Sequence, residues 1–137
     1  MVGLELRKTQ KMAEKKFEMA TTDKLLSGQL TVLVLIKHNP GETQSAIARA
    51  AGIDRSSLVP ILKQFEKKGY VSRRKAERDS RSNIIEITRA GEHALSELQP
   101  VVTELETSVT DQFGANNTKQ LVALLKKFQL VIKQDNV

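Results

Sequence analysis

The segment QSAIARAAGIDRSSLVPILK, residues 44–63, constrains the fold more than any other part of the chain. Two short helices that cross steeply need a small residue where they touch and a turn residue that tolerates a positive φ angle. Ala48 and Gly52 satisfy these two needs. Apolar residues that would lock one helix over the other stand at Ile47, Ala51, Ile53, Leu58 and Ile61. The spacing predicts a helix-turn-helix, and the alternative is a helical hairpin in an ordinary bundle.

Capping residues set the limits of these two helices. Thr43 and Asp54 are good N-caps, so they predict helices that begin beside them. Gly52 and Gly69 supply the left-handed residue with which helices commonly end. The helices are therefore expected over residues 43–51 and 55–68.

Apolar periodicity predicts further helices on both sides of this segment. Residues 4–24 form an amphipathic pattern with a strongly basic outer side. Residues 30–36, LTVLVLI, could be a strand or a buried helix; Ser27 as an N-cap and the turn at Pro40 favour the helix. Two more helices are expected over residues 90–113 and 118–133.

A basic hairpin follows the second helix of the pair. Two strands are expected over residues 70–75 and 83–88, joined by a polar loop. Residues 73–81 contain five cations and two acids, a net charge of +3, in a chain whose net charge is +6. Such charge indicates an acidic partner, either nucleic acid or an anionic membrane surface. No apolar run approaches the ~18 residues of a membrane span and no signal peptide is present, so the expected location is the cytoplasm and no membrane partner is expected.

These stretches resemble the MarR family of bacterial transcriptional regulators. The resemblance rests on GQLTVLVLIKHNPGETQSAIARAAGIDRSSLVPILKQFEKKGYVSRR, then on the wing RDSRS and the helix entry ITRAG. It implies a mainly α fold with a small β wing, a winged helix-turn-helix flanked by N- and C-terminal dimerisation helices. It also implies a wing-tip role for Asp79 and Arg81, although Ser80 stands where the family commonly has the first of two arginines.

A DNA-binding surface is expected on the outer side of the second helix and on the wing. A recognition helix enters the major groove with its N-terminal half leading, so Arg55 could reach guanine edges or a phosphate. Val59 suits a thymine methyl group, and Pro60 would bend the helix slightly. Asp79 is expected to orient Arg81 or Arg78 by a charge-assisted bond. The full set is Gln44, Arg55, Ser56, Ser57, Val59, Pro60, Lys63, Arg73, Arg74, Arg78, Asp79 and Arg81.

The terminal helices indicate a homodimer. The long helix carries a heptad seam, formed by Leu95, Leu98, Val102, Leu105 and Val109. Either the terminal helices pack on their own domain, or they pair across a two-fold axis and set two recognition helices ~34 Å apart on a pseudo-palindrome. The expected segments are an N-terminal dimerisation helix (1–26), the winged helix-turn-helix (27–89) and C-terminal dimerisation helices (90–137).

The resemblance implies release of DNA by a small anionic or aromatic effector. Candidate lining residues are Arg7, Phe17 and His38, with Lys15 or Lys16 as further anion partners.

No catalytic residue, cofactor or metal site is expected. The chain has no cysteine and no phosphate-binding glycine loop, and His38 and His93 have no acidic partner pattern. The function expected is sequence-specific regulation of transcription, most commonly repression, by a protein that is not an enzyme. The alternatives are a non-specific DNA-architectural protein and a basic helical protein–protein adaptor.

Overall fold

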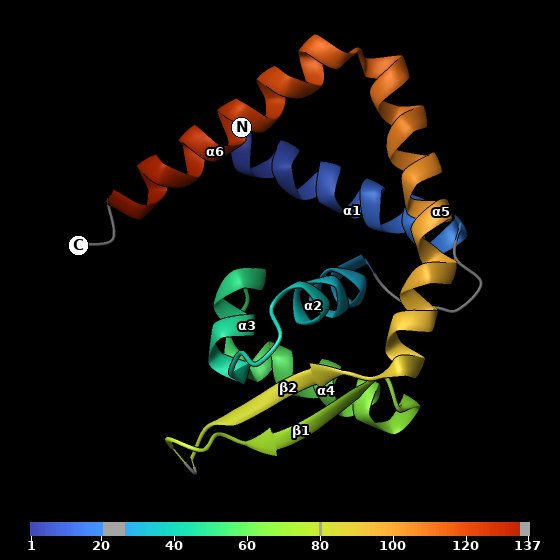
Figure 1. Ribbon diagram of the computed structural model, residues 1–137. Helices are drawn as coiled ribbons and strands as arrows, with labels where there is room; N and C mark the ends of the chain where they lie inside the picture. The colour runs from blue at the N-terminus through green and yellow to red at the C-terminus, as the bar shows by residue number, and fades with distance from the viewer. Residues whose placement is uncertain (21–26, 80, 135–137) are drawn as a thin grey trace. The chain divides into compact units, whose positions relative to one another are not determined.

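The computed structural model describes residues 1–20, 27–79 and 81–134 (Figure 1). The end of the expected first helix at Lys24 and the wing residue Ser80 lie outside these ranges. The elements are α1 (Val2–Ala20), α2 (Ser27–His38), α3 (Gln44–Ala51), α4 (Arg55–Lys68), β1 (Val71–Lys75), β2 (Asn83–Ile87), α5 (Arg89–Phe113) and α6 (Ala115–Gln134). The mainly α fold with a two-stranded wing is confirmed, and α6 begins three residues before the expected start at Thr118.

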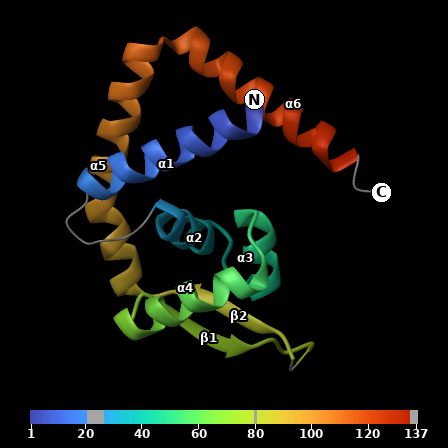
Figure 2. The same cartoon turned by 180° about the vertical axis from the view of Figure 1, so that it is seen from behind.

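The chain divides into two compact units, Met1–Val101 and Val102–Val137. The first unit contains the helix-turn-helix, the wing and one apolar core. Figure 2 shows α4 lying across the hairpin of β1 and β2. The core residues are Val32, Leu33, Ile36, Ile47, Ala48, Leu58, Leu62, Phe65, Val71, Ile85, Leu95 and Leu98.

The segment LTVLVLI is helical, which decides between the two alternatives that its sequence left open. Val32, Leu33 and Ile36 all lie in α2 and are at most 1% exposed. Their spacing places them on one side of the helix, so the short apolar run reflects a buried helix face and not a strand.

The wing is anchored at its base. Strands β1 and β2 are antiparallel, with Val71 opposite Ile87 and Arg73 opposite Ile85. The N–H of Ile85 donates to the carbonyl of Glu42 over 3.2 Å, so β2 is also tied to the segment that precedes α3. This backbone hydrogen bond therefore joins the wing to the segment that leads into α3.

The first turns of α5 complete this core. Leu95 and Leu98 are buried in it, whereas Leu105 is half-buried and Val109 is exposed. The heptad seam is thus divided, because its first two positions pack inside the winged-helix unit. The DNA-binding segment was expected to end at residue 89, but the core of this unit also includes Leu95 and Leu98.

The start of α5 needs a glycine at its third residue. Thr88 caps the helix: the N–H of Gly91 donates to the Oγ1 of Thr88 over 3.1 Å, and the Thr88 hydroxyl donates to the carbonyl of Gly69. A Cβ added at Gly91 would overlap the carbonyl oxygen of Tyr70 and lie 2.8 Å from Cγ1 of Ile87. Both neighbours are held, one by backbone and one by the strand, so neither can yield easily.

We expect Gly91→Ala to lower the free energy of unfolding by about 3 kcal/mol, because overpacking must displace backbone here. Chemical denaturation followed by circular dichroism measures the change. The control is Gly28→Ala, where an added Cβ meets nothing within 4 Å; it should leave stability unchanged or raise it slightly. Equal stability of the two variants would contradict the close approach at Gly91.

Candidate nucleic-acid interface

The turn between α3 and α4 has the geometry that the sequence predicts. Thr43 Oγ1 accepts the N–H of Ala46 over 3.2 Å, which begins α3. Gly52 has a φ of 69°, and the N–H of Ile53 returns to the carbonyl of Ala48 over 3.1 Å. This left-handed cap ends α3 and turns the chain into α4. The helix-turn-helix is confirmed.

The packing face of α4 contains more residues than the sequence predicted. Leu58 is buried as expected, but Leu62 and Phe65 are buried as well. They follow Leu58 by four and seven residues, the spacing of one helix face, so periodicity along α4 could have identified them. They hold α4 firmly against the core, which leaves its other face outward.

The N-terminal end of α4 is capped by Asp54. Its carboxylate accepts the backbone N–H of Ser57 over 3.3 Å and the hydroxyl of Ser56 over 2.8 Å. Hydrogen bonds from Ser57 and Ser56 hold the pKa of Asp54 below its ordinary value. Because this lowers the pKa in the folded state, the cap stabilises the helix at neutral pH and loses its effect only as the pH falls through that lowered value. Ser56 is therefore part of the cap as well as of the outer surface.

The outer face of α4 is open to a partner. Arg55, Ser56, Ser57, Pro60 and Lys63 are exposed, and Val59 is half-buried. The helix is continuous through Pro60, whose missing N–H would have bonded the carbonyl of Ser56. Since Ser56 is exposed, water can satisfy that carbonyl.

Gln44 differs from the other candidates. It is the first residue of α3 and is 6% exposed. Its role as a DNA contact stays a prediction, and little of the residue is accessible for such a contact. The residue type gave no sign of this, since glutamine is usually exposed.

Asp79 organises the tip of the wing through backbone. Its carboxylate accepts the backbone N–H of Arg81 over 3.0 Å and the hydroxyl of Ser82 over 3.2 Å. Among the described residues it forms no ion pair with the guanidinium of Arg81 or Arg78. The expected charge-assisted clamp is therefore corrected: Asp79 shapes the turn and leaves both guanidinium groups outward.

The wing cations fall into two groups. Arg73 is paired with Glu66 over 2.7 Å, and Arg74 with Glu86 over 3.1 Å. The side chains that are exposed and have no ion pair within the described part of the chain are Lys75, Arg78 and Arg81. The unpaired cations lie at the end of β1 and in the loop, where the wing extends furthest from the core (Figure 1).

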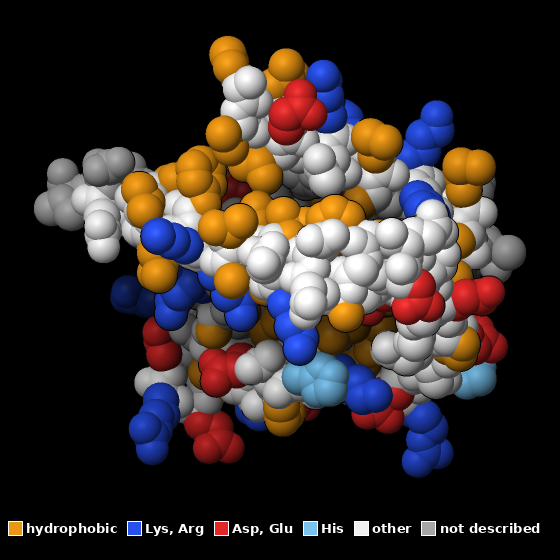
Figure 3. Space-filling view, turned by 90° about the horizontal axis from the view of Figure 1, so that it is seen from above, with side chains coloured by type: hydrophobic (Ala, Val, Ile, Leu, Met, Phe, Trp, Pro, Cys, Tyr) orange, Lys and Arg blue, Asp and Glu red, His pale blue; other side chains and the backbone are white. Residues whose placement is uncertain are grey.

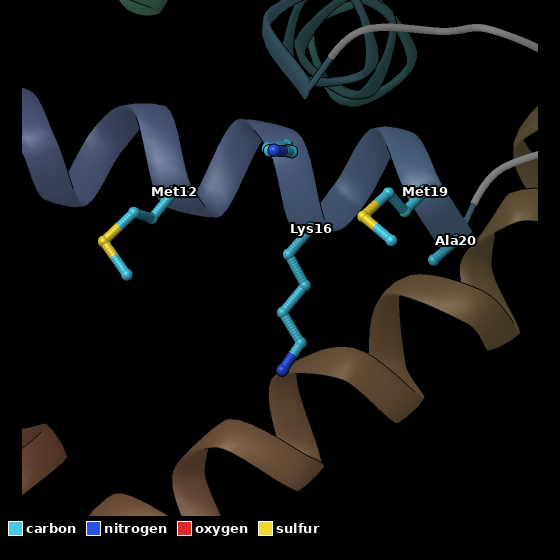
Figure 4. Close-up of a pocket in the computed structure, with 5 residues that line it drawn as sticks. Met12, Lys16, Met19 and Ala20 are labelled. Carbon is cyan, nitrogen blue, oxygen red and sulfur yellow. The ribbon is translucent and has the colours of Figure 1, made fainter.

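The structure does not group the three expected effector residues. Phe17 is buried, whereas Arg7 is exposed ten residues earlier on α1, or ~15 Å along a helix. His38 is exposed at the end of α2. A pocket of about 400 Å³ lies instead on α1, lined by Met12, Lys15, Lys16, Met19 and Ala20. In Figure 4 its labelled residues extend from the same side of the helix.

The described residues form neither a metal-binding cluster nor a membrane-spanning helix. Within the described ranges, no group of three or more His, Asp or Glu side chains could hold a metal ion. None of the described helices combines the length and the apolar character that crossing a membrane requires.

A helix-turn-helix followed at once by a basic two-stranded hairpin defines a winged-helix protein. The sequence profile of the MarR family matches residues 25–82. A protein of Thauera aromatica assigned as a transcriptional regulatory protein for the hcr operon is 31% identical over 128 residues, which cover 92% of this chain and 77% of that protein. The chain belongs to the MarR family of transcriptional regulators.

Solved structures agree with this assignment. The transcriptional repressor CouR, bound to a 23-mer DNA duplex, superposes with a TM-score of 0.87 at 29% identity, over 94% of this chain and 92% of CouR. The Mycobacterium tuberculosis transcriptional regulator MosR, in complex with DNA, has the same fold, with a TM-score of 0.88 at 20% identity over 100% and 99% of the two chains.

Proposed function

We propose that the protein is a sequence-specific DNA-binding transcriptional repressor that binds a pseudo-palindromic operator as a homodimer. One observation carries the proposal: the exposed face of α4 and the unpaired wing cations belong to one compact unit with a shared apolar core. Two outward surfaces held on one core can engage a groove and the neighbouring backbone together. The similar repressor CouR, at 29% identity, is bound to a DNA duplex, which supports duplex DNA as the partner.

The leading end of α4 enters the major groove. Arg55 is the first residue of this helix and is exposed, so it can reach a base edge or a phosphate. Ser57 and Lys63 contact the backbone, and Val59 with Pro60 provides an apolar surface for a thymine methyl group. The wing places Lys75, Arg78 and Arg81 along the phosphates beside the minor groove.

This role needs no reaction and no cofactor. Recognition of DNA requires only the outward side chains of α4 and the wing, and the proposed place of action is the cytoplasm, where a bacterial operator is found. The proposed dimerisation segments remain residues 1–26 and 90–137, with the first turns of α5 also serving the winged-helix core.

We expect Arg55→Ala to weaken operator binding by about 1–3 kcal/mol and Arg81→Ala to weaken it and reduce its salt dependence. The site would be a palindrome selected from random duplexes, and wild type should prefer it by ~10³ or more. Fluorescence anisotropy in competition with random DNA measures both quantities. Lys119→Ala, which removes a cation from exposed α6, is the matched control.

Two outcomes would contradict the proposal. Equal affinity for selected and random duplexes would identify an architectural protein. Absence of DNA binding at low salt would leave a protein–protein adaptor.

The homodimer is supported by the apolar surface of α6. None of its described residues is buried, although many of them are apolar. Five large apolar side chains are between 39% and 63% exposed: Leu121, Leu124, Phe128, Leu130 and Ile132. Apolar side chains are prominent at the surface in the space-filling view (Figure 3). An amphipathic helix whose described residues are all exposed or half-buried gains little from packing in one chain, so a second copy is the occupant that we propose.

We expect the double variant Leu121→Glu/Phe128→Glu to convert the dimer to a monomer at micromolar concentration. The two positions are seven residues apart on one face, and two carboxylates there would have to be buried on association. Sedimentation equilibrium gives the mass. Gln120→Glu/Lys127→Glu adds acid at the same spacing on exposed polar positions and should leave the dimer intact. A wild-type monomer would refute this part of the proposal.

The effector site that we propose is the pocket on α1. Met12 and Met19 are 72% and 80% exposed and provide apolar contact, while Lys15 and Lys16 provide cations beside them. A ligand with an apolar body and an anionic group fits this lining. Arg7, Phe17 and His38 do not line it.

We expect aromatic carboxylates to raise the melting temperature of the wild type, and the matching neutral amides to do so less. Lys15→Ala/Lys16→Ala should remove the difference between acid and amide, because the anion partners are gone. The control Lys8→Ala/Lys11→Ala removes two cations from the same helix outside the pocket. This variant should retain the difference between acid and amide. Retention of the difference in both double variants would exclude this pocket.

A further inference from the structure

Arg73 differs from the neighbouring Arg74 in the face of the hairpin that it occupies, and it is the wing cation that lies opposite a fully buried residue. It lies opposite Ile85, and directly opposed residues in an antiparallel pair share one face. Ile85 is fully buried and belongs to the core. Arg73 therefore leaves β1 on the face that packs toward α4, and its side chain is only 31% exposed.

The partner of Arg73 is on the recognition helix itself. Nε of Arg73 donates to Oε1 of Glu66 over 2.7 Å, and the Glu66 side chain is 35% exposed. Glu66 lies in the last turn of α4, eleven residues after Arg55, or ~16 Å along the helix. The pair thus joins the wing to the end of α4 that points away from the proposed groove contact.

The second ion pair of the wing has a different geometry. Arg74 and Glu86 belong to β1 and β2, so their bond of 3.1 Å stays within the hairpin. Their side chains are also more exposed, at 49% and 41%. The Arg74–Glu86 pair can influence the hairpin itself but cannot fix the direction of the hairpin relative to α4. It is therefore an internal control for the Arg73–Glu66 pair.

We propose that Glu66 and Arg73 are positioning residues that set the angle between the wing and the recognition helix, and that Arg73 makes no phosphate contact. The inference rests on the proposed DNA-binding function. A half-exposed ion pair contributes little to global stability. Its effect here is directional, because it is the charged link between two surfaces that must meet one duplex in register.

The direction in which Glu66→Gln changes DNA affinity distinguishes a positioning role of Arg73 from a phosphate contact. If Arg73 contacted a phosphate, Glu66 would compete with DNA for its guanidinium, and Glu66→Gln would tighten binding. If the pair positions the wing, the same substitution weakens the link and lowers affinity. Glu66→Gln is nearly isosteric and changes only the charge.

The experiment measures operator affinity over a range of salt concentrations. Glu66→Gln and Arg73→Ala should each weaken binding about tenfold with the salt slope unchanged, whereas Arg81→Ala should reduce the slope by about one. The charge-swapped variant Glu66→Arg/Arg73→Glu should recover affinity to within about threefold of wild type, because the link is restored in reverse. Glu86→Gln should behave as wild type.

A second readout needs no DNA. The chain has no cysteine, so Glu77→Cys and Lys67→Cys allow two spin labels, one on the wing and one on α4. Their distance distribution should broaden with Glu66→Gln and stay narrow with Glu86→Gln.

Three outcomes bear on the two proposals separately. Tighter binding by Glu66→Gln, with a smaller salt slope for Arg73→Ala, would overturn the positioning role. Unchanged affinity with an unchanged distance distribution would overturn it too. A distribution that broadens as expected in a protein with no operator preference would uphold the link and refute the DNA-binding function.

Discussion

The architecture depends on burial of the inner face of α4. Leu58, Leu62 and Phe65 are at most 1% exposed, and each contributes roughly 1.5–3 kcal/mol by leaving water. The core that receives them comes from α2, α3, the wing strands and the first turns of α5. Because these elements hold α4 from one side, its other face is directed outward, and the proposed role of the Arg73–Glu66 pair is to set the remaining angle between α4 and the wing.

The same arrangement makes α5 more than a connector. Its first turns place Leu95 and Leu98 in the core, and the helix then continues without interruption into the second unit. Gly91 permits this by letting the helix start against the backbone of Tyr70. An effector or a partner that acts on the later turns of α5 therefore acts on a helix whose beginning supports the recognition helix.

Local signals in the sequence predicted much of the fold. Thr43, Gly52, Asp54 and Gly69 act within four residues of their own positions, so they predicted the bounds of α3 and α4 almost to the residue. Apolar spacing likewise predicted that Ile47 and Leu58 point inward, although the prediction did not include Leu62 and Phe65. Such features are readable because a cap or a helix face needs no distant partner.

Features that depend on distant contacts were not readable. The burial of Gln44 follows from the packing around the start of α3, and no pattern in its neighbours shows it. A heptad seam is the same in sequence whether it faces a partner helix or a domain core, so the division at Leu98 became visible only in the structure. The link from Arg73 to Glu66 similarly depends on which face of the hairpin packs on α4.

These contacts change the electrostatic description of the wing. By sequence, five cations could each neutralise a phosphate, but two of them already face carboxylates. Each phosphate contact contributes about 0.9 to the salt slope on duplex DNA, so three unpaired cations account for a slope of about 2.7 from each wing instead of about 4.5. The acids thus do not simply reduce the charge of the wing. They restrict its strong electrostatic contacts to the tip, where Asp79 has shaped the turn, and this restriction favours a defined position on the duplex over general attraction to it.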